Sequence, residues 1–274
     1  MAMIINTNIS SIAAQNSLHS SSLNEQRAME RLSSGLRINN AKDDAAGLAI
    51  STRMTATIRG MAAAIRNAND GISVTQTAEG SMAAIQDSLQ RIRELAVQSA
   101  NDTNGGADHT SLHSEATALV GEISRVVSVT KFNGVSLIDG TYTSQKIQVG
   151  SDSTTNDYIS VTINNLAASA LSITGVALTS TGSSYTALSI LDSAINTVSS
   201  ARASMGTYQN QLNAAITNLH NTSMNLQASR SRILDTDYAA ETTNLAKAQI
   251  IQQAATAMLA QANQSSQTVL ALLK

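Results

Sequence analysis

The stretch Gly47–Ser99, GLAISTRMTATIRGMAAAIRNANDGISVTQTAEGSMAAIQDSLQRIRELAVQS, decides the fold of this chain. Small and medium-sized side chains recur along it at alternating steps of three and four, the spacing of one face of a continuous helix. This face contains Gly47, Ile50, Met54, Thr57, Met61, Ala64, Ala68, Gly71, Thr75, Ala78, Met82, Ile85, Leu89, Ile92, Ala96 and Ser99. With a rise of about 1.5 Å per residue the helix would be about 80 Å long, so other helices must cover its apolar face.

The composition favours a helical protein without a large aromatic core. Of 274 residues, 42% are hydrophobic but only 2% are aromatic, so burial must come from aliphatic side chains on helices. Proline is absent, which removes the strongest helix breaker. Cysteine is absent as well, which excludes disulfides, thiolate metal sites and cysteine nucleophiles.

The charge pattern excludes several classes of partner. The net charge is -2, the isoelectric point is about 6.1, and no lysine- or arginine-rich run occurs, so we expect no nucleic-acid partner. The first residues, MAMIINTN, contain neither a basic leader nor an apolar core, so no secretory signal peptide is predicted. No apolar run is long enough to cross a bilayer, and no membrane association is expected.

The hydrophobic period divides the chain into five segments. We expect an N-terminal core helix and connector at 1–43, a long helix and a return helix at 44–131, a β-hairpin tip with loops at 132–184, a C-terminal coiled-coil helix at 185–234 and a C-terminal core helix at 235–274. The predicted fold is mainly α: an elongated antiparallel coiled-coil bundle with a small β-hairpin, in which the N- and C-terminal helices pair.

Local signals define the boundaries of these segments. Gly35 can end the first helix in a left-handed cap conformation, and the return helix should run from about Ser111 to Lys131. Alternation of polar and apolar residues predicts two strands, Lys146–Val149 and Ile159–Ile163, paired as a hairpin. The Ser/Thr/Gly-rich segment Thr179–Ser184 is predicted to be an exposed loop.

The two terminal segments are nearly free of charge but still contain apolar stripes. No charged residue occurs before Asn24, and none occurs from Ala248 to Leu273. Such helices have little to stabilise them alone, so we expect them to be disordered in a free monomer and to order against other copies of the chain. The candidate packing residues are Ile5, Ile9, Ile12, Leu23, Leu245, Ile251, Ala255, Met258, Leu259, Ala262, Val269 and Leu273.

Polar residues interrupt the apolar face of the 185–234 helix. Arg202, Gln209, Ser223 and Arg230 all fall on it. One interpretation is a solvent-facing edge. The other is a device that sets helix register or a contact between subunits, because a polar residue in a helical seam fixes alignment at a cost in stability.

No constellation of catalytic residues is found. His109 and His113 are spaced to share one helix face and could bind a metal, but no HExxH pattern or carboxylate completes such a site. Phosphate-binding glycine loops and a Ser-His-Asp spacing are missing too. The chain is therefore not expected to be an enzyme or to hold a cofactor or a metal.

Several long motifs resemble bacterial flagellin. They are ERLSSGLRIN at 30–39, AKDDAAG at 41–47, NDGIS at 69–73, LQRIRELAVQ at 89–98, FNG at 132–134 and SRILDTDYA at 231–239. The chain resembles a short member of that family, without the large outer domains that many members insert centrally.

The resemblance implies a self-polymerising subunit of the flagellar filament, the helical propeller for swimming. It implies secretion by the flagellar type III apparatus and an extracellular location. It also implies an export chaperone, a cap protein and hook-filament junction proteins as partners. The terminal helices, matching residues 2–34 and 237–274, would form nested tubes around a central channel.

The resemblance also implies recognition by host receptors. Arg91, Leu95, Gln98 and Glu115 match the surface read by Toll-like receptor 5, and Leu270, Leu272 and Leu273 match the leucines read by cytosolic NAIP receptors. The alternative for all of them is structural, as solvated helix charges and packed core leucines. Two rival functions remain: a hook-filament junction protein, and a secreted coiled-coil effector or adhesin.

Overall fold

The computed structural model describes residues 7–152 and 154–272, with side chains through residue 264. They form two units. Unit 1 contains the described residues up to Ala56 and those from Asn225 onward, and unit 2 contains Thr57–Met224. Two long helices, α2 (Ala45–Ser99) and α4 (Thr181–Leu234), contribute residues to both units.

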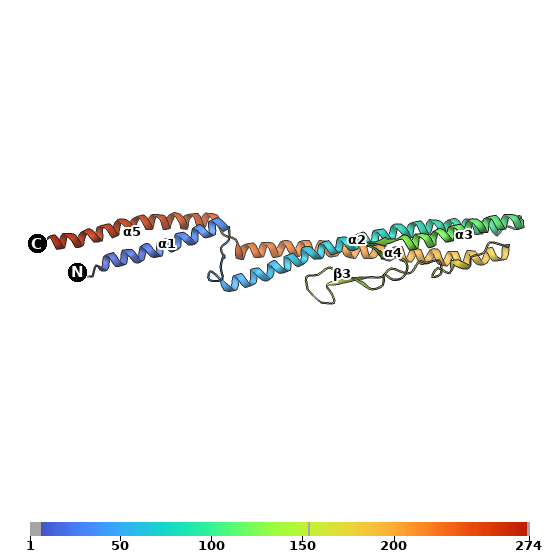
Figure 1. Cartoon of the computed structure of the whole chain (residues 1–274), viewed down its shortest axis with the longest axis horizontal. Helices are drawn as coiled ribbons and strands as arrows, with labels where there is room; N and C mark the ends of the chain where they lie inside the picture. Colours follow the sequence, from blue (N-terminus) through green and yellow to red (C-terminus); the bar gives the residue numbers. More distant parts are fainter. Residues whose placement is uncertain (1–6, 153, 273–274) are drawn as a thin grey trace. The chain divides into compact units, whose positions relative to one another are not determined.

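Unit 1 is built on an antiparallel pair of helices, α1 (Ile9–Ser34) and α5 (Tyr238–Leu272), which lie side by side (Figure 1). The side chain of Asn8 caps α1 by accepting a hydrogen bond from the backbone N–H of Ser11 at 3.1 Å. Gly35 ends the helix at a φ of 71°, and its N–H donates to the carbonyl of Arg31. The predicted helix end is therefore confirmed, and glycine fits because it adopts this left-handed conformation without a steric penalty.

The connector after α1 is bound to the end of α4 within unit 1. The Arg37 N–H donates to the carbonyl of Leu234 at 2.7 Å, and its guanidinium donates to the carbonyl of Ile233 at the same distance. Ile38, within the connector, has a buried side chain. The Asp44 carboxylate accepts from the N–H of Gly47 at 2.8 Å, so it caps the start of α2, where the helix dipole favours negative charge.

Asp43 organises the turn in this connector. Its carboxylate accepts hydrogen bonds from the backbone N–H groups of Asn39 at 3.2 Å and Asn40 at 3.0 Å. These bonds, chiefly the one from Asn40, hold the pKa of Asp43 below its ordinary value of 3.8. A depressed folded pKa stabilises the turn above the ordinary value, and this contribution is lost as the pH falls through the folded pKa.

The change Asp43→Asn should open this turn at neutral pH. We expect faster hydrogen exchange at the amides of Asn39 and Asn40, because a neutral amide accepts weaker hydrogen bonds than a carboxylate. The protection of the two proteins should converge in acid, once the pH falls below the lowered pKa of Asp43 and its carboxylate is itself protonated. Equal protection at neutral pH, measured by NMR, would contradict this role.

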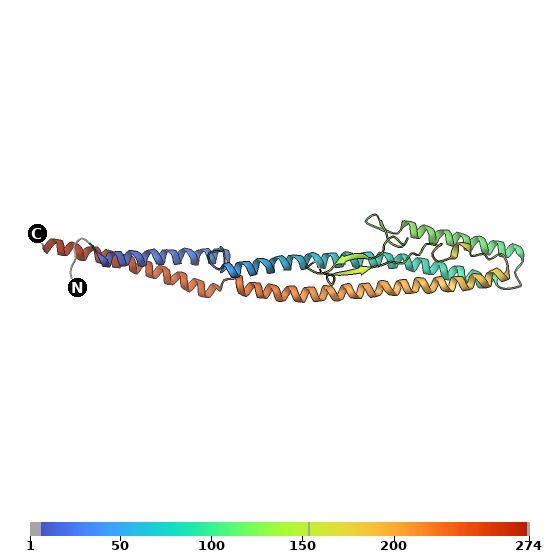
Figure 2. The ribbon, with the colours of Figure 1, turned by 90° about the horizontal axis from the view of Figure 1, so that it is seen from below.

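Unit 2 has a core of three helices, two of which extend beyond the third as a pair. There α2 and α4 run antiparallel, and α3 (Gly106–Val129) packs alongside them (Figure 2). Aliphatic side chains from all three helices fill the core: Met82, Ile85, Leu89 and Ile92 of α2, Ile123 of α3, and Leu191 and Val198 of α4. The return helix begins at Gly106, earlier than the predicted Ser111, because Asp108 bonds back to the N–H of Gly105 and starts the helix there.

Two short hairpins lie between α3 and α4. The strands β3 (Gln145–Gln148) and β4 (Tyr158–Val161) pair antiparallel, with Ile147 opposite Ile159, which confirms the predicted hairpin. The strands β1 (Lys131–Phe132) and β2 (Val135–Ser136) form a second hairpin that was not predicted. Its turn, Asn133-Gly134, has positive φ at both residues, the conformation that Asn-Gly turns favour.

The prediction of an exposed loop at Thr179–Ser184 is wrong in its second half. Helix α4 begins at Thr181, and Ser184 is fully buried. Ser180 and Ser183 bond each other reciprocally, because the Ser180 N–H donates to the Ser183 hydroxyl and the Ser183 N–H to the Ser180 hydroxyl. The serine-rich composition therefore encodes a helix cap.

The segment after β4 is an unpredicted part of the core. It has no regular period and contains only a short 3-10 turn, η1 (Ile173–Gly175), yet Ile163, Leu166, Ile173 and Leu178 are all buried in it. This segment therefore covers the α2–α4 pair where α3 alone does not.

Candidate assembly surface

Small side chains and hydrogen bonds form the contact inside the α1–α5 pair. Ser21 and Ala28 of α1 and Ala248 and Ala255 of α5 are buried there. The Ser21 hydroxyl donates to the carbonyl of Ala248 at 2.7 Å, and the Asn8 amide donates to the carbonyl of Ala262 at 2.9 Å. Small residues let the two backbones approach closely, so the pair uses little of its large apolar surface.

The large apolar residues of this pair remain largely exposed to solvent. Ile9, Ile12, Leu23 and Ile251 are exposed, and Met258 is 64% exposed. Of the other predicted packing residues, Leu245, Leu259 and Ala262 are half-buried and Ala255 is buried. Ile5 and Leu273 lie outside the described residues, and Val269 lies in the part of α5 whose side chains are not described. Met29 and Ile250 are also exposed on these helices, outside the predicted set.

A polar groove of about 670 Å³ runs between α1 and α5. Ser17 and Asn24 line it from α1, and Lys247 lines it from α5. Arg31 and Glu241, also in its wall, form an ion pair at 3.7 Å. The walls of the groove are therefore mainly polar, although Ile251 of the apolar stripe also lines it.

The predicted receptor residues lie on α2 and α3 in unit 2. The Arg91 guanidinium donates to the Glu115 carboxylate at 2.9 Å and to Glu94 at 3.0 Å, and Gln98 is exposed on the same helix. Glu115 raises the pKa of Arg91 by its hydrogen bond. Leu95 is only 1% exposed and packs in the core, so its side chain lies beneath this surface. The side chains of Leu270, Leu272 and Leu273 lie outside the described part of the chain.

The two spaced histidines take part in a buried polar network instead of pairing with each other. His109 Nδ1 lies 2.7 Å from the Ser99 hydroxyl, and Ser184 donates to that hydroxyl at 2.8 Å. His113 Nδ1 accepts from the N–H of Leu178 at 3.4 Å. Among residues 7–152 and 154–272, no group of three or more metal-ligand side chains is close enough to hold an ion.

The change Ser99→Ala should destabilise unit 2 by about 1–3 kcal/mol, because it leaves the buried groups of His109 and Ser184 without their shared partner. Urea unfolding of the monomer measures this loss. Ser124→Ala, on the exposed face of α3, should change the free energy of unfolding by less than about 0.5 kcal/mol. Equal effects of the two changes would contradict a role for the network.

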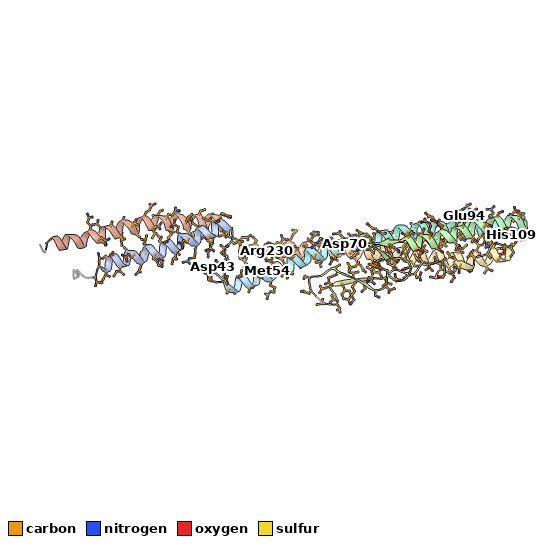
Figure 3. All side chains as sticks on the ribbon, viewed as in Figure 1. Asp43, Met54, Asp70, Glu94, His109 and Arg230 are labelled. Carbon is orange, nitrogen blue, oxygen red and sulfur yellow. The ribbon has the colours of Figure 1, made fainter. Side chains whose placement is uncertain are left out.

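Three of the four polar residues of the α4 seam bond side chains of α2, which favours the register interpretation, although all four remain partly exposed. Arg202 donates to Gln86 at 2.7 Å, and Gln209 donates to Glu79 at 3.0 Å. In unit 1, Arg230 donates to the hydroxyl of Thr55 at 3.3 Å, beside Met54 of α2 (Figure 3). Ser223 is half-buried and also has a partner.

Known proteins are similar to this chain over nearly its whole length. Residues 5–143 match the bacterial flagellin N-terminal helical region, and residues 188–273 match the bacterial flagellin C-terminal helical region. A flagellin of Halalkalibacterium halodurans is 44% identical over 272 residues, which cover 99% of this chain and all of that protein. Polar flagellin A of Vibrio parahaemolyticus is 35% identical over 375 aligned residues that cover all of both chains. The crystal structure of Bacillus cereus flagellin superimposes with a TM-score of 0.51 at 30% identity, over 56% of this chain and 88% of that one.

The paired terminal helices and these matches define a structural, non-enzymatic filament subunit. The chain belongs to the bacterial flagellin family. It is a short form, because the 375-residue alignment with the Vibrio relative exceeds its own 274 residues.

Its function is that of the flagellar filament subunit in motility, and the rival functions of junction protein and secreted effector give way to it. The family forms an extracellular filament by self-polymerisation. Among the described residues, no helix combines the length and the apolar character that a membrane crossing requires.

Proposed function

We propose that the exposed apolar stripe on α1 and α5, formed by Ile9, Ile12, Leu23, Ile251 and Met258, is the surface through which this flagellin binds other copies of itself. The observation that supports it is the division of side chains within the pair. Small residues make the internal contact, while the large apolar residues stay exposed. Exposed stripes of this kind mark interaction sites on soluble proteins.

The terminal helices order only when these copies meet. The α1–α5 pair contains few buried apolar side chains, so its internal contacts offset little of the entropy of two long helices. Burial of the stripe between subunits supplies the additional free energy that is needed to order the two helices. The scarcity of charge in these helices prevents like charges from stacking in a lattice of identical chains.

The same termini serve export and assembly partners. Uncharged segments that are unfolded alone suit passage through the flagellar type III apparatus, which the family resemblance implies. An export chaperone would cover the stripe before secretion, and the cap protein and the junction proteins would contact it during assembly. The apolar character of the stripe supports this proposal, since each partner must shield it from water.

Seeded polymerisation of purified monomer tests the assembly surface. The full chain is compared with a variant that lacks residues 1–34 and 237–274, by negative-stain microscopy and circular dichroism. We expect long filaments and a gain in helicity from the full chain alone. A full chain that is completely helical before seeding would overturn ordering on assembly, and filaments from the truncated chain would overturn the assembly surface.

A second role, recognition by Toll-like receptor 5, is favoured by the exposed ion pair between Arg91 and Glu115, which joins α2 and α3. This ion pair and Gln98 form a polar surface. The buried Leu95 packs beneath that surface. A NAIP receptor would read the C-terminal leucines, Leu270, Leu272 and Leu273, in the same host.

The change Arg91→Ala should lower Toll-like receptor 5 signalling by the monomer at least about tenfold, because arginine is a frequent interface hot spot. A reporter-cell titration gives the half-maximal concentration. The matched control is Arg125→Ala, which removes an exposed arginine paired with Glu122 on α3. Equal potency of both variants would remove Arg91 from the recognition surface.

A further inference from the structure

The apolar seam between α2 and α4 in unit 2 does not determine its own alignment. Both helices repeat apolar residues with a heptad spacing, so a shift of α4 by one heptad again places apolar residues against apolar residues. The buried seam residues are Ala64, Ala68, Ala78, Met82, Ile85, Leu89 and Ile92 on α2, and Leu191, Ala194, Val198, Ala201, Met205, Leu212 and Leu219 on α4. Polar contacts between the two helices must therefore select one register, and they include the buried Ser184–Ser99 hydrogen bond at one end of the pair.

Four partly exposed polar side chains flank this repeat near the middle of the seam. Glu79 and Gln86 lie one heptad apart on α2, and Arg202 and Gln209 lie one heptad apart on α4. Gln86 accepts from Arg202 at 2.7 Å, Glu79 accepts from Gln209 at 3.0 Å, and Arg202 lies 3.8 Å from the Glu79 carboxylate. We call these four residues the polar layer.

We propose that the polar layer is a register lock, which selects one alignment of α2 against α4. The polar layer adds little to the stability of the native register. Its main effect is to raise the free energy of the shifted registers. The Arg202–Glu79 pair is about one-third exposed on both sides, and such pairs contribute little. Arg202 Nε is buried without a partner among the described residues, so the layer is imperfect as a stabilising device.

A shift in one direction leaves two half-buried amides facing apolar side chains at the edge of the seam. If α4 moves so that Arg202 lies opposite Glu79, the same displacement brings Gln86 opposite Ile195 and Gln209 opposite Ile72. The ion pair survives, but both glutamines lose their partners. Loss of a hydrogen bond by each half-buried amide disfavours that alignment.

A shift in the other direction juxtaposes charges. Arg202 then lies opposite Arg93, and Glu79 lies opposite Ile216. The movement also separates Arg93 from Asp192, with which it forms an ion pair at 2.6 Å. Like charges and an unpaired carboxylate disfavour this alignment. The polar layer therefore excludes both neighbouring registers, each for a different reason.

Because the two shifted registers are disfavoured for different reasons, a variant can permit one of them and still exclude the other. In the variant Gln86→Leu with Gln209→Leu, the first shift no longer costs two half-buried amides their hydrogen bonds, and it still aligns Glu79 with Arg202. The second shift remains blocked by the two arginines. The variant should therefore populate the first shifted register and not the second.

Spin-label distances can read this register, because the chain has no cysteine of its own. Labels are placed on Gln90→Cys and Asn218→Cys, which are exposed positions on α2 and α4. They lie about 30 Å apart along the helix axes in the native register, and the first shift lengthens this separation by about 10 Å. We expect one distance in the otherwise unchanged chain, and an added longer distance in the Gln86→Leu/Gln209→Leu variant.

Two further variants complete the experiment. Replacing all four residues of the polar layer by leucine should give both a longer and a shorter population. The control, Glu122→Leu with Arg125→Leu, alters an ion pair within α3 and should keep the single native distance. A single native distance in the double glutamine variant would overturn the proposal. Loss of its helicity in circular dichroism would also overturn it, since the layer would then be required for folding itself.

Discussion

Replacing Ile251 and Met258 of α5 by aspartate should abolish filament growth while the monomer keeps the fold of unit 2. Both side chains are exposed in the single chain, 40% and 64% respectively, so the substitutions cost the monomer little. In the filament each aspartate would be buried without a partner against the apolar stripe of a neighbour, at a cost of several kcal/mol.

The critical concentration for polymerisation measures this effect. It should rise at least about 100-fold, since each 1.4 kcal/mol changes an equilibrium constant tenfold. The matched control is Ile251→Val with Met258→Leu, which keeps both positions apolar and should polymerise at nearly the original concentration. Filaments of the aspartate variant at the original concentration would show that this part of the stripe is not a subunit contact.

The second large effect is expected in the three-helix core of unit 2. Leu89 is 0% exposed, and Leu89→Ala should lower the free energy of unfolding by about 2–5 kcal/mol, through lost burial and the cavity left behind. Val97→Ala, on the same helix but 51% exposed, should change it by less than about 0.5 kcal/mol. Urea unfolding of the monomer, followed by circular dichroism, compares the two. A loss below about 1 kcal/mol for Leu89→Ala would mean that the site collapses without a cavity.

Regular elements were predictable because their signals are local. The left-handed cap at Gly35 and the pairing of Ile147 with Ile159 follow from residue type and from alternation over a few positions. The Asn133-Gly134 hairpin had an equally local signal that went unused. These features depend on backbone sterics and on neighbouring side chains, which a short window of sequence contains.

Irregular parts of the core were not predictable in this way. Between β4 and α4, Leu166 and Ile173 are buried although no period links them, because their positions are set by contacts with distant helices. Ser180 and Ser183 show a different error, in which a regular element was predicted to be a loop. Their composition suggested a loop, but a helix start uses the same residues for its cap.

Part of the assembly surface was evident from sequence, namely the apolar stripes on two nearly uncharged terminal helices. The direction in which those stripes face was not. A helical pattern shows which residues share a face, but it does not show whether that face meets the partner helix or solvent. The structure has Ser21 and Ala248 in the contact and leaves Ile12 and Met258 outside.

By itself, the amino-acid sequence determined the helical class, the two helix-rich ends, the β3–β4 hairpin and the resemblance to flagellin, because these depend on periodicity and on contiguous motifs. The tertiary structure alone decided that Leu95 is buried, that Arg202 and Gln209 meet Gln86 and Glu79, and that the large apolar residues of α1 and α5 face outward. The physical reason is that burial and hydrogen bonding between distant segments depend on which helices pair and in what register, and a repeating seam of small residues is compatible with more than one answer.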